Sequence, residues 1–116
     1  RVYRFAETLL NAAELLVLTN GDNEEAARYV NRVRNRAGLN SLSTVTQDVI
    51  INERDLEFLG EGKRYFDLVR TGKASSVLVP DSYGYRTNTW SQKKKYIPIA
   101  QAELDSDPSL VQNDYK

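Results

Sequence analysis

The sequence predicts a mainly α-helical fold, built as tetratricopeptide-like antiparallel helix pairs with a long loop and an irregular C-terminal tail. Three observations lead to this prediction. Apolar residues recur at helical spacing along roughly the first 70 residues, caps and glycines interrupt them at short intervals, and the pattern stops where polar residues take over. Because a short turn makes consecutive helices pack antiparallel, the interruptions define helix pairs.

The first pair is expected in the first third of the chain. Residues 1–19 carry one apolar face, and Asn20 and Gly21 end this helix because both tolerate the left-handed conformation. Asp22 is typical of a helix N-cap, where the side chain contributes about 1 kcal/mol. Gly38 is expected to stop the second helix that follows.

A second pair is predicted to follow. Thr44 or Thr46 caps a third helix, Gly60 and Gly62 break the chain, and a short fourth helix covers about residues 63–69. The apolar side of the third helix is expected to consist of Val45, Val49, Ile50, Leu56 and Leu59. The two units repeat at about 45 residues, not the ~34 of a regular tetratricopeptide repeat, so the stack is only repeat-like.

Residues 73–95 are predicted to form a long loop, because they are rich in polar residues and have few apolar anchors. Residues 96–99 could then form a short extended edge segment. The loop combines aromatic rings with planar polar side chains, which suits sugar binding. Its candidate ligand-binding residues are Tyr83, Tyr85, Arg86, Asn88 and Trp90, with Gln92 beside them. Alternatively, the aromatic residues pin the loop to the helices.

Residues 53–72 concentrate charge around the Gly60–Gly62 bend. The expected structural ion-pair network consists of Glu53, Arg54, Glu57, Glu61, Arg64, Asp67 and Arg70. Glu53 falls on the apolar stripe and needs a cation, for which Arg54, Arg64 and Arg70 are the local candidates. If that carboxylate is buried and paired, Glu53→Ala should cost ~3–5 kcal/mol, against ~0–1 for a surface pair.

The same segment allows a catalytic interpretation. Glu53, Glu57 and Glu61 recur every four residues, and a glycosidase needs two carboxyl groups about 5–10 Å apart in an open cleft. Arginines alternate with these acids, which favours the structural interpretation.

Composition excludes several other functions. Lys+Arg and Asp+Glu number 16 each, which argues against a nucleic-acid module, and the triplet Lys93–Lys95 is typical of a solvated surface. The chain has no cysteine or histidine, so it contains no disulfide, thiolate–zinc site or Ser/His/Asp triad. Asp105 and Asp107, with Glu103 nearby, could hold calcium, although Asp107 before Pro108 more simply starts a turn. We expect no metal and no cofactor.

The charged segment resembles a signature of the SusD/RagB family. The matching residues are Glu53-Arg54, Glu57, Glu61-Gly62, Arg64, Tyr65-Phe66, Asp67-Leu68, Arg70 and Gly72. The stretches RFAETLLNAAELL, VNRVRNRAGL and YIPIAQAELDSDPSLVQNDY resemble the family as well. The departures are Lys63, where the family usually has histidine, and Ala100, Asp107 and Asp114 in the tail.

The resemblance implies that residues 1–116 are a single C-terminal domain of a larger protein, and the absence of methionine also indicates a processed or excised piece. It further implies non-catalytic capture of polysaccharide or oligosaccharide at the outer-membrane surface. The partner would be a TonB-dependent (SusC-like) transporter. The anchor would be a lipid on a missing N-terminal cysteine, and this segment would serve mainly as scaffold. The alternatives are a repeat-type protein-binding module using Asn31, Arg34 and Asn35, and the carboxylate-based glycoside hydrolase.

Overall fold

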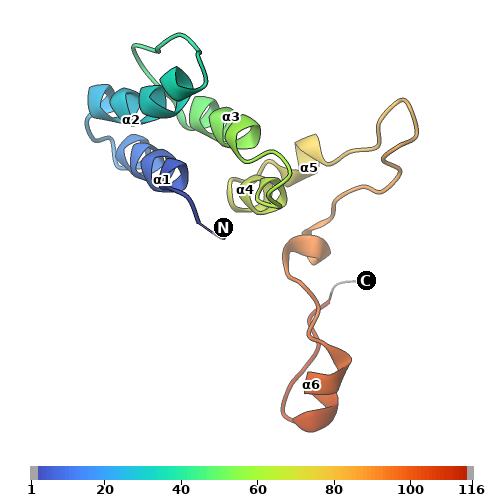
Figure 1. Ribbon diagram of the computed structural model, residues 1–116. Helices are drawn as coiled ribbons and strands as arrows, with labels where there is room; N and C mark the ends of the chain where they lie inside the picture. Colours follow the sequence, from blue (N-terminus) through green and yellow to red (C-terminus); the bar gives the residue numbers. More distant parts are fainter. Residues whose placement is uncertain (1–2, 115–116) are drawn as a thin grey trace. The chain divides into compact units, whose positions relative to one another are not determined.

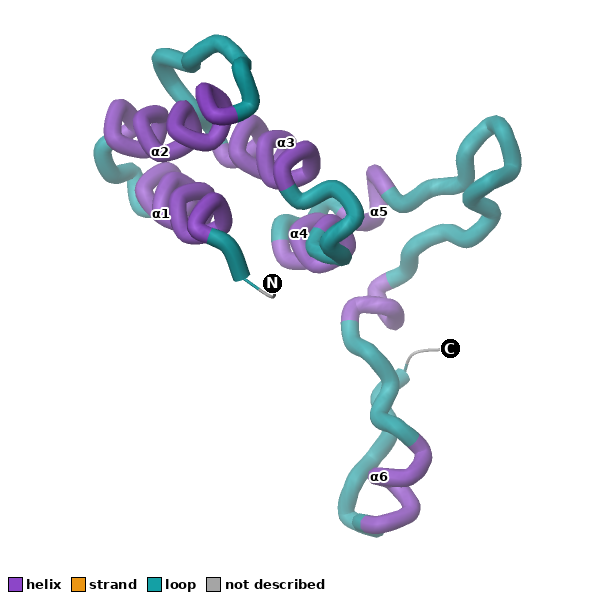
Figure 2. The backbone as a smooth tube through the Cα atoms, viewed as in Figure 1, coloured by secondary structure: helices purple, strands orange, loops and turns teal. Residues whose placement is uncertain are grey.

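The computed structural model describes residues 3–114, and every regular element among them is a helix (Figures 1 and 2). This confirms the mainly α-helical prediction. The helices are α1 (Phe5–Leu18), α2 (Asn23–Arg36), α3 (Gln47–Glu57), α4 (Arg64–Arg70), α5 (Ala74–Val77) and α6 (Gln101–Ser106), with a 3₁₀ turn η1 (Gln92–Lys95). The chain divides into two compact units, unit 1 up to Asp67 and unit 2 from Leu68 onward. No helix in the described residues is long and apolar enough to cross a membrane.

The first helix pair forms as the sequence predicts. Asn20 takes a left-handed conformation with φ of 52°, which turns the chain between α1 and α2. The Asp22 carboxylate then caps α2 by accepting hydrogen bonds from the backbone N–H groups of Glu24 and Glu25, at 2.9 and 3.1 Å. This satisfies two of the donors that a helix start leaves unpaired.

The core of unit 1 lies where α1, α2 and α3 meet. Its buried members are Leu9, Leu10, Ala13, Ala26, Ala27, Val30, Val33, Val45, Ile50 and Phe58. The alanines lie on α1 and α2, and their small side chains let the two helix axes approach closely. Leu10, Val30 and Ile50 then fill the space between the three helices.

The third helix agrees with the prediction at its start and differs from it on its apolar side. Its N-cap is Thr46, one of the two threonines predicted, and the Thr46 hydroxyl accepts a hydrogen bond from the Val49 N–H at 3.3 Å. Leu56 and Leu59 were expected on its apolar side, but both are exposed. The reason is geometric, because Leu56 lies on the outer side of α3, and the helix ends at Glu57 before Leu59 is reached.

Unit 2 is less regular than unit 1, and it differs from the predicted loop and strand. The expected loop over residues 73–95 contains α5 and η1, with loop between them (Figure 2). The expected extended segment at residues 96–99 forms no strand among the described residues. The Gln112 side chain takes the place of a strand partner: its Oε1 accepts from the Ile99 N–H and its Nε2 donates to the Ile99 carbonyl, both at 2.9 Å.

Candidate functional site

Residues 81–86 form a tight turn, here called the tyrosine turn, which is organised by one carboxylate. Asp81 Oδ1 accepts hydrogen bonds from the N–H groups of Tyr83 and Tyr85 at 2.8 and 3.1 Å. Its Oδ2 accepts from the Arg86 N–H at 2.6 Å. The Asp81 N–H in turn donates to the Arg86 carbonyl at 3.0 Å, so the two ends of the turn are tied together. Gly84 has a φ of 78°, a conformation in which a side chain would be strained.

The turn presents two aromatic rings to solvent. Tyr83 and Tyr85 are 83% and 93% exposed, and their ring centroids lie 6.4 Å apart with 33° between the planes. Exposed aromatic faces held by a backbone that is already ordered need little further ordering when a ligand stacks on them. This is the kind of surface that the C–H face of a sugar can contact.

The turn's carboxylate is held in its ionised form. Partial burial, the largest single influence, raises the pKa of Asp81, but the backbone N–H groups of Arg86, Tyr83, Tyr85 and Gly84 together outweigh it. The net result is a pKa below the ordinary value for aspartate. The hydrogen bonds that the backbone N–H groups donate to Asp81 therefore persist at neutral pH.

Two of the other predicted ligand-binding residues, Arg86 and Trp90, make contacts within the chain that the tyrosine side chains do not make. The Arg86 guanidinium donates to the Val77 carbonyl at 2.9 Å, and the Trp90 backbone N–H donates to the Leu78 carbonyl at 3.1 Å. Trp90 is half-buried, whereas Asn88 is exposed. Arg86 and Trp90 thus connect the loop to the end of α5, and the tyrosine pair stands outside those connections.

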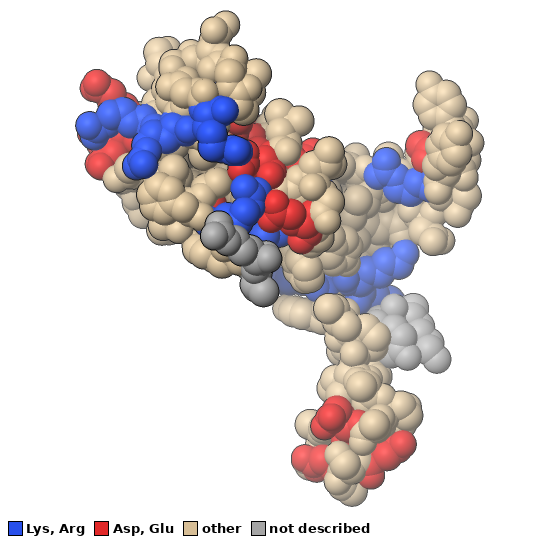
Figure 3. Space-filling view, in the orientation of Figure 1, with Lys and Arg blue, Asp and Glu red and all other residues tan. Residues whose placement is uncertain are grey.

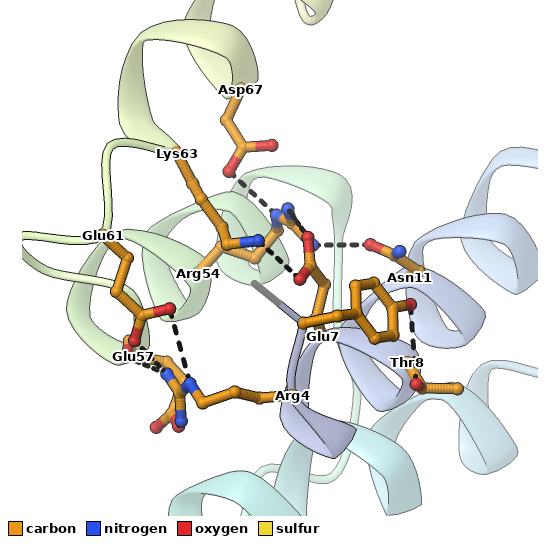
Figure 4. A network of polar contacts seen from close by, with 10 residues as sticks. Arg4, Glu7, Thr8, Asn11, Arg54, Glu57, Glu61, Lys63 and Asp67 are labelled. Carbon is orange, nitrogen blue, oxygen red and sulfur yellow. Dashed lines mark hydrogen bonds and ion pairs between the residues drawn. The ribbon is translucent and has the colours of Figure 1, made fainter. Parts of the chain in front are cut away.

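The charged segment of unit 1 forms a buried network around Arg54 (Figure 4). Arg54 Nε donates to Asp67 Oδ2 at 2.9 Å, and its NH1 donates to Asn11 Oδ1 at 2.6 Å. The side chains of Arg54 and Asp67 are each only 5% exposed. Glu7 lies 3.9 Å from Arg54 NH2 and pairs with Lys63 Nζ at 2.6 Å. The network therefore ties α1, α3 and the start of α4 together.

A second cluster of ion pairs holds Glu57 and Glu61, two of the three glutamates that recur every four residues. Arg4 pairs with Glu57 at 2.7 Å and with Glu61 at 2.6 Å, and Arg36 pairs with Glu57 at 2.6 Å. The hydrogen bonds that Arg4 donates to Glu57, and then to Glu61, raise the pKa of Arg4 above its ordinary value. Carboxylates that form ion pairs with arginines in this way connect separate segments of the chain. This favours the structural interpretation over paired-carboxylate catalysis.

Glu53 finds a partner that the sequence did not indicate. Its Oε2 accepts from Arg34 NH1 of α2 at 2.7 Å, so none of the three local arginines supplies the ion pair seen here. Arg64 instead pairs with Asp55 at 3.2 Å in a partly exposed position. The expectation of a buried, paired Glu53 agrees with the structure, and the expected partners were wrong.

The residues suggested for a protein-binding groove are engaged within unit 1. The Asn31 amide donates to the Leu42 carbonyl and accepts from the Leu42 N–H, both at 2.8 Å. Arg34 donates to the Asn40 carbonyl, and Asn35 accepts from the Ser41 hydroxyl. These side chains fasten the loop between α2 and α3, and Asn31 also lines a hollow of about 460 Å³ beside that loop.

The acidic and basic residues of the tail make local contacts. Asp107 accepts from the Ser109 hydroxyl and N–H, which lower its pKa and make it the predicted turn starter. Asp105 accepts from Gln101, and Lys93 pairs with Asp114 at 3.0 Å. Among the described residues, no group of three or more acidic side chains is placed to hold a metal ion.

Two features of these sites were missed at the sequence level. Arg4 and Arg36 lie 53 and 21 positions from Glu57, and no local spacing indicates such distant partners. Asp81 did carry a signal, because an aspartate followed by a glycine three residues later is typical of a turn in which the side chain accepts backbone hydrogen bonds.

Comparison with known proteins assigns the chain to a class. Its helical fold is that of solved surface glycan-binding proteins: it superposes on surface glycan-binding protein A from Bacteroides uniformis with a TM-score of 0.92 and 62% identity, covering 100% of this chain and 28% of that one. The corresponding protein from Bacteroides thetaiotaomicron, solved in complex with laminarihexaose, gives a TM-score of 0.85 and 59% identity, covering 99% and 25%.

The family follows from the sequence. The SusD family model matches residues 1–115. SusD-like protein P2 of Formosa agariphila is 32% identical over 95% of this chain and 24% of its own length, and starch-binding protein SusD of Bacteroides thetaiotaomicron is 32% identical over 97% and 21%. The chain belongs to the SusD family, and it spans about a quarter of the length of these relatives.

Proposed function

We propose that this chain is part of a protein that captures a glycan at the cell surface, and that the tyrosine turn contributes to glycan contact. The observation that carries the second part is the exposed pair Tyr83 and Tyr85, held 6.4 Å apart by the Asp81 hydrogen bonds. Two ring faces at this spacing suit contact with neighbouring sugar units of one chain. Arg86 supports the turn from behind through the Val77 carbonyl.

The proposed ligand is a glucan of the laminarin type. Two similar structures support this choice: the Bacteroides thetaiotaomicron protein solved with laminarihexaose, and a protein described as a laminarin-binding SusD-like protein, 38% identical over 96% of this chain. Stacking of tyrosine rings on a neutral glucan requires no charge complementarity.

Unit 1 is proposed to act as scaffold, and the protein is proposed to be non-catalytic. Glu53, Glu57 and Glu61 are each bound by an arginine, so these three carboxyl groups are not arranged as the acid and nucleophile of a glycosidase. The proposed setting is the outer-membrane surface, through a lipid anchor elsewhere in the polypeptide, with a TonB-dependent transporter as partner. This setting is inferred from family membership.

A glucan panel tests the proposal. The full-length protein should bind laminarin and laminarihexaose in calorimetric titrations, and it should release no reducing ends from either ligand. Binding to none of the panel would contradict glycan capture, and steady release of reducing ends would contradict the non-catalytic role. Co-purification of the full-length protein with a TonB-dependent transporter from detergent-solubilised membranes tests the partnership separately.

A further inference from the structure

The loop between α2 and α3 is held beside α2 by two asparagine side chains. Asn23 accepts from the Val45 N–H at 3.0 Å and donates to the Val45 carbonyl at 2.7 Å. Asn31 makes the same pair of bonds with Leu42, both at 2.8 Å. Residues 42–45 therefore run alongside α2 in the opposite direction, fastened at both ends. A wall that is ordered in this way needs little further ordering when a ligand binds against it.

A hollow of about 460 Å³, here called the α2–loop hollow, lies between this segment and α2. Its volume is within the range of about 300–1,000 Å³ that small-ligand pockets occupy. The α2 residues that border it lie three to five positions apart or next to one another, so they share one face of the helix. Between the two asparagines, the lining consists of Glu24, Ala27 and Arg28 of α2 and of Leu42, Ser43 and Thr44 of the loop.

The α2–loop hollow is apolar at its base and polar at its rim. Ala27 is only 3% exposed, and Leu42 is partly buried and packs against the core of unit 1. Glu24, Ser43 and Thr44 are exposed around them. A sugar ring has the matching form, because its faces carry C–H groups and its edge carries hydroxyl groups.

The polar groups of the rim are available to a ligand. The ion pair of Arg28 with Glu25 is long, at 3.8 Å, and the Arg28 side chain is 68% exposed. Within the part of the chain that the structure describes, no hydrogen bond or ion pair holds the Glu24 carboxylate or the hydroxyls of Ser43 and Thr44.

The charges of the rim favour a neutral ligand. One carboxylate and one guanidinium, from Glu24 and Arg28, give no net charge, and Figure 3 shows charged side chains of both signs along α2. An anion would meet the carboxylate and a cation would meet the guanidinium. A hydroxyl group both donates and accepts hydrogen bonds, so a polyol can use both partners at once.

We propose that the α2–loop hollow is a second carbohydrate subsite, which takes one neutral sugar unit. The C–H face of the ring lies on Ala27 and Leu42. At the edge of the ring, Glu24 accepts a hydrogen bond from one hydroxyl group and Arg28 donates to another. The subsite rests on the proposed glycan capture, and it adds a contact in unit 1 to the one at the tyrosine turn.

A fluorine tag at the rim tests this proposal in the full-length protein. Ser43→Cys provides a thiol of nearly the same size, and a trifluoromethyl thiol reagent makes it visible by fluorine NMR. Asn40→Cys is the matched control, because Asn40 is exposed in the same loop and lies outside the lining. Laminarihexaose should shift the signal of the Ser43→Cys protein saturably and leave that of Asn40→Cys unchanged. The shift should persist when Tyr83→Ala and Tyr85→Ala are added.

A rim variant tests the hydrogen bonds of the subsite. Arg28→Ala removes one charged donor and should weaken the titration of the tagged protein about tenfold. Because Arg28 is exposed, its melting temperature should not change. Arg28→Lys keeps a cationic donor and should restore most of the affinity. An unchanged titration for Arg28→Ala would overturn the subsite, since the rim would then make no contact with the sugar.

Calorimetry of the wild-type protein with laminarihexaose separates this proposal from glycan capture itself. Calorimetric binding without a shift at the rim, or with equal shifts at both tags, would overturn the subsite and leave glycan capture standing. No calorimetric binding and no shift would contradict glycan capture, and the subsite with it. A Ser43→Cys thiol that reacts only in denaturant would show that other polypeptide covers the hollow, which would also overturn the subsite.

Discussion

Unit 1 and unit 2 keep their shapes by different means. Unit 1 encloses an apolar core and joins distant positions through buried charges: Asn11 and Arg54 are 43 residues apart, and Arg4 and Glu57 are 53 apart. The contacts described in unit 2 span shorter separations, from two to five residues between Asp81 and the backbone of the tyrosine turn to 13 residues between Ile99 and Gln112.

This difference bears on function. A surface loop held by its own backbone contacts can change its outward side chains without disturbing a core elsewhere, whereas a buried charge network fails when one member is lost. Unit 1 is therefore suited to be scaffold, and the tyrosine turn of unit 2 is suited to carry specificity.

The largest expected loss of stability follows from a substitution in the buried network of unit 1. Arg54→Ala leaves Asp67 buried without its arginine and also removes the partner of Asn11, so it should lower the free energy of unfolding by ~3–5 kcal/mol. Arg64→Ala is the control, because the pair of Arg64 with Asp55 is partly exposed and should contribute only ~0–1 kcal/mol. Denaturant titration of the full-length protein measures both. Similar losses for the two variants would erase the distinction between buried and surface pairs.

A somewhat smaller loss is expected for Glu53→Ala. It leaves Arg34 without its carboxylate, but the Arg34 side chain is partly exposed and keeps its bond to the Asn40 carbonyl. The expected cost lies in the lower part of the ~3–5 kcal/mol range, by the same denaturant titration. A loss below ~1 kcal/mol would mean that water replaces the ion pair at this position.

The N-cap of α2 is expected to contribute less to the free energy of unfolding than these ion pairs. Asp22→Ala removes the acceptor for the Glu24 and Glu25 N–H groups and should cost ~1 kcal/mol in thermal or denaturant unfolding. Asp22→Asn retains a side-chain oxygen and should behave nearly as wild type. If the alanine variant were as stable as wild type, α2 would depend on packing alone.

The smallest effect is a pH dependence of the tyrosine turn. The pKa of Asp81 is lowered in the folded protein, so its stabilisation of the turn is complete above the ordinary aspartate pKa of about 3.9 and is lost as pH falls through the lowered value. Glucan affinity should thus stay level from neutral pH down to about pH 4 and fall below it. Affinity that declines already between pH 7 and pH 5 would require another titrating group.

The helices and caps of unit 1 were predictable because the signals are local, as with Asp22 and the Asn20 turn. The ion-pair partners were only half predictable. The sequence indicates that Glu53 needs a cation, but its partner Arg34 lies on another helix, and only the packing of α2 against α3 selects it.

The residue types of the candidate site could be read from the sequence, but the arrangement of its side chains could not. The aromatic loop could be identified from its residues, yet its division into the exposed pair Tyr83 and Tyr85 and the half-buried Trp90 depends on how the chain turns. The exposure of Leu56 was missed for a related reason, because apolar spacing alone does not indicate which side of a helix is covered.

The tyrosine turn's role is tested most directly by titrating laminarihexaose into the full-length protein and its Tyr83→Ala/Tyr85→Ala variant. Tyr96→Ala is the matched control, an exposed tyrosine of unit 2 outside the turn. We expect the double variant to lose affinity about tenfold or more with an unchanged melting temperature, and Tyr96→Ala to bind as wild type. Wild-type affinity in the double variant would contradict the account and leave both units as scaffold.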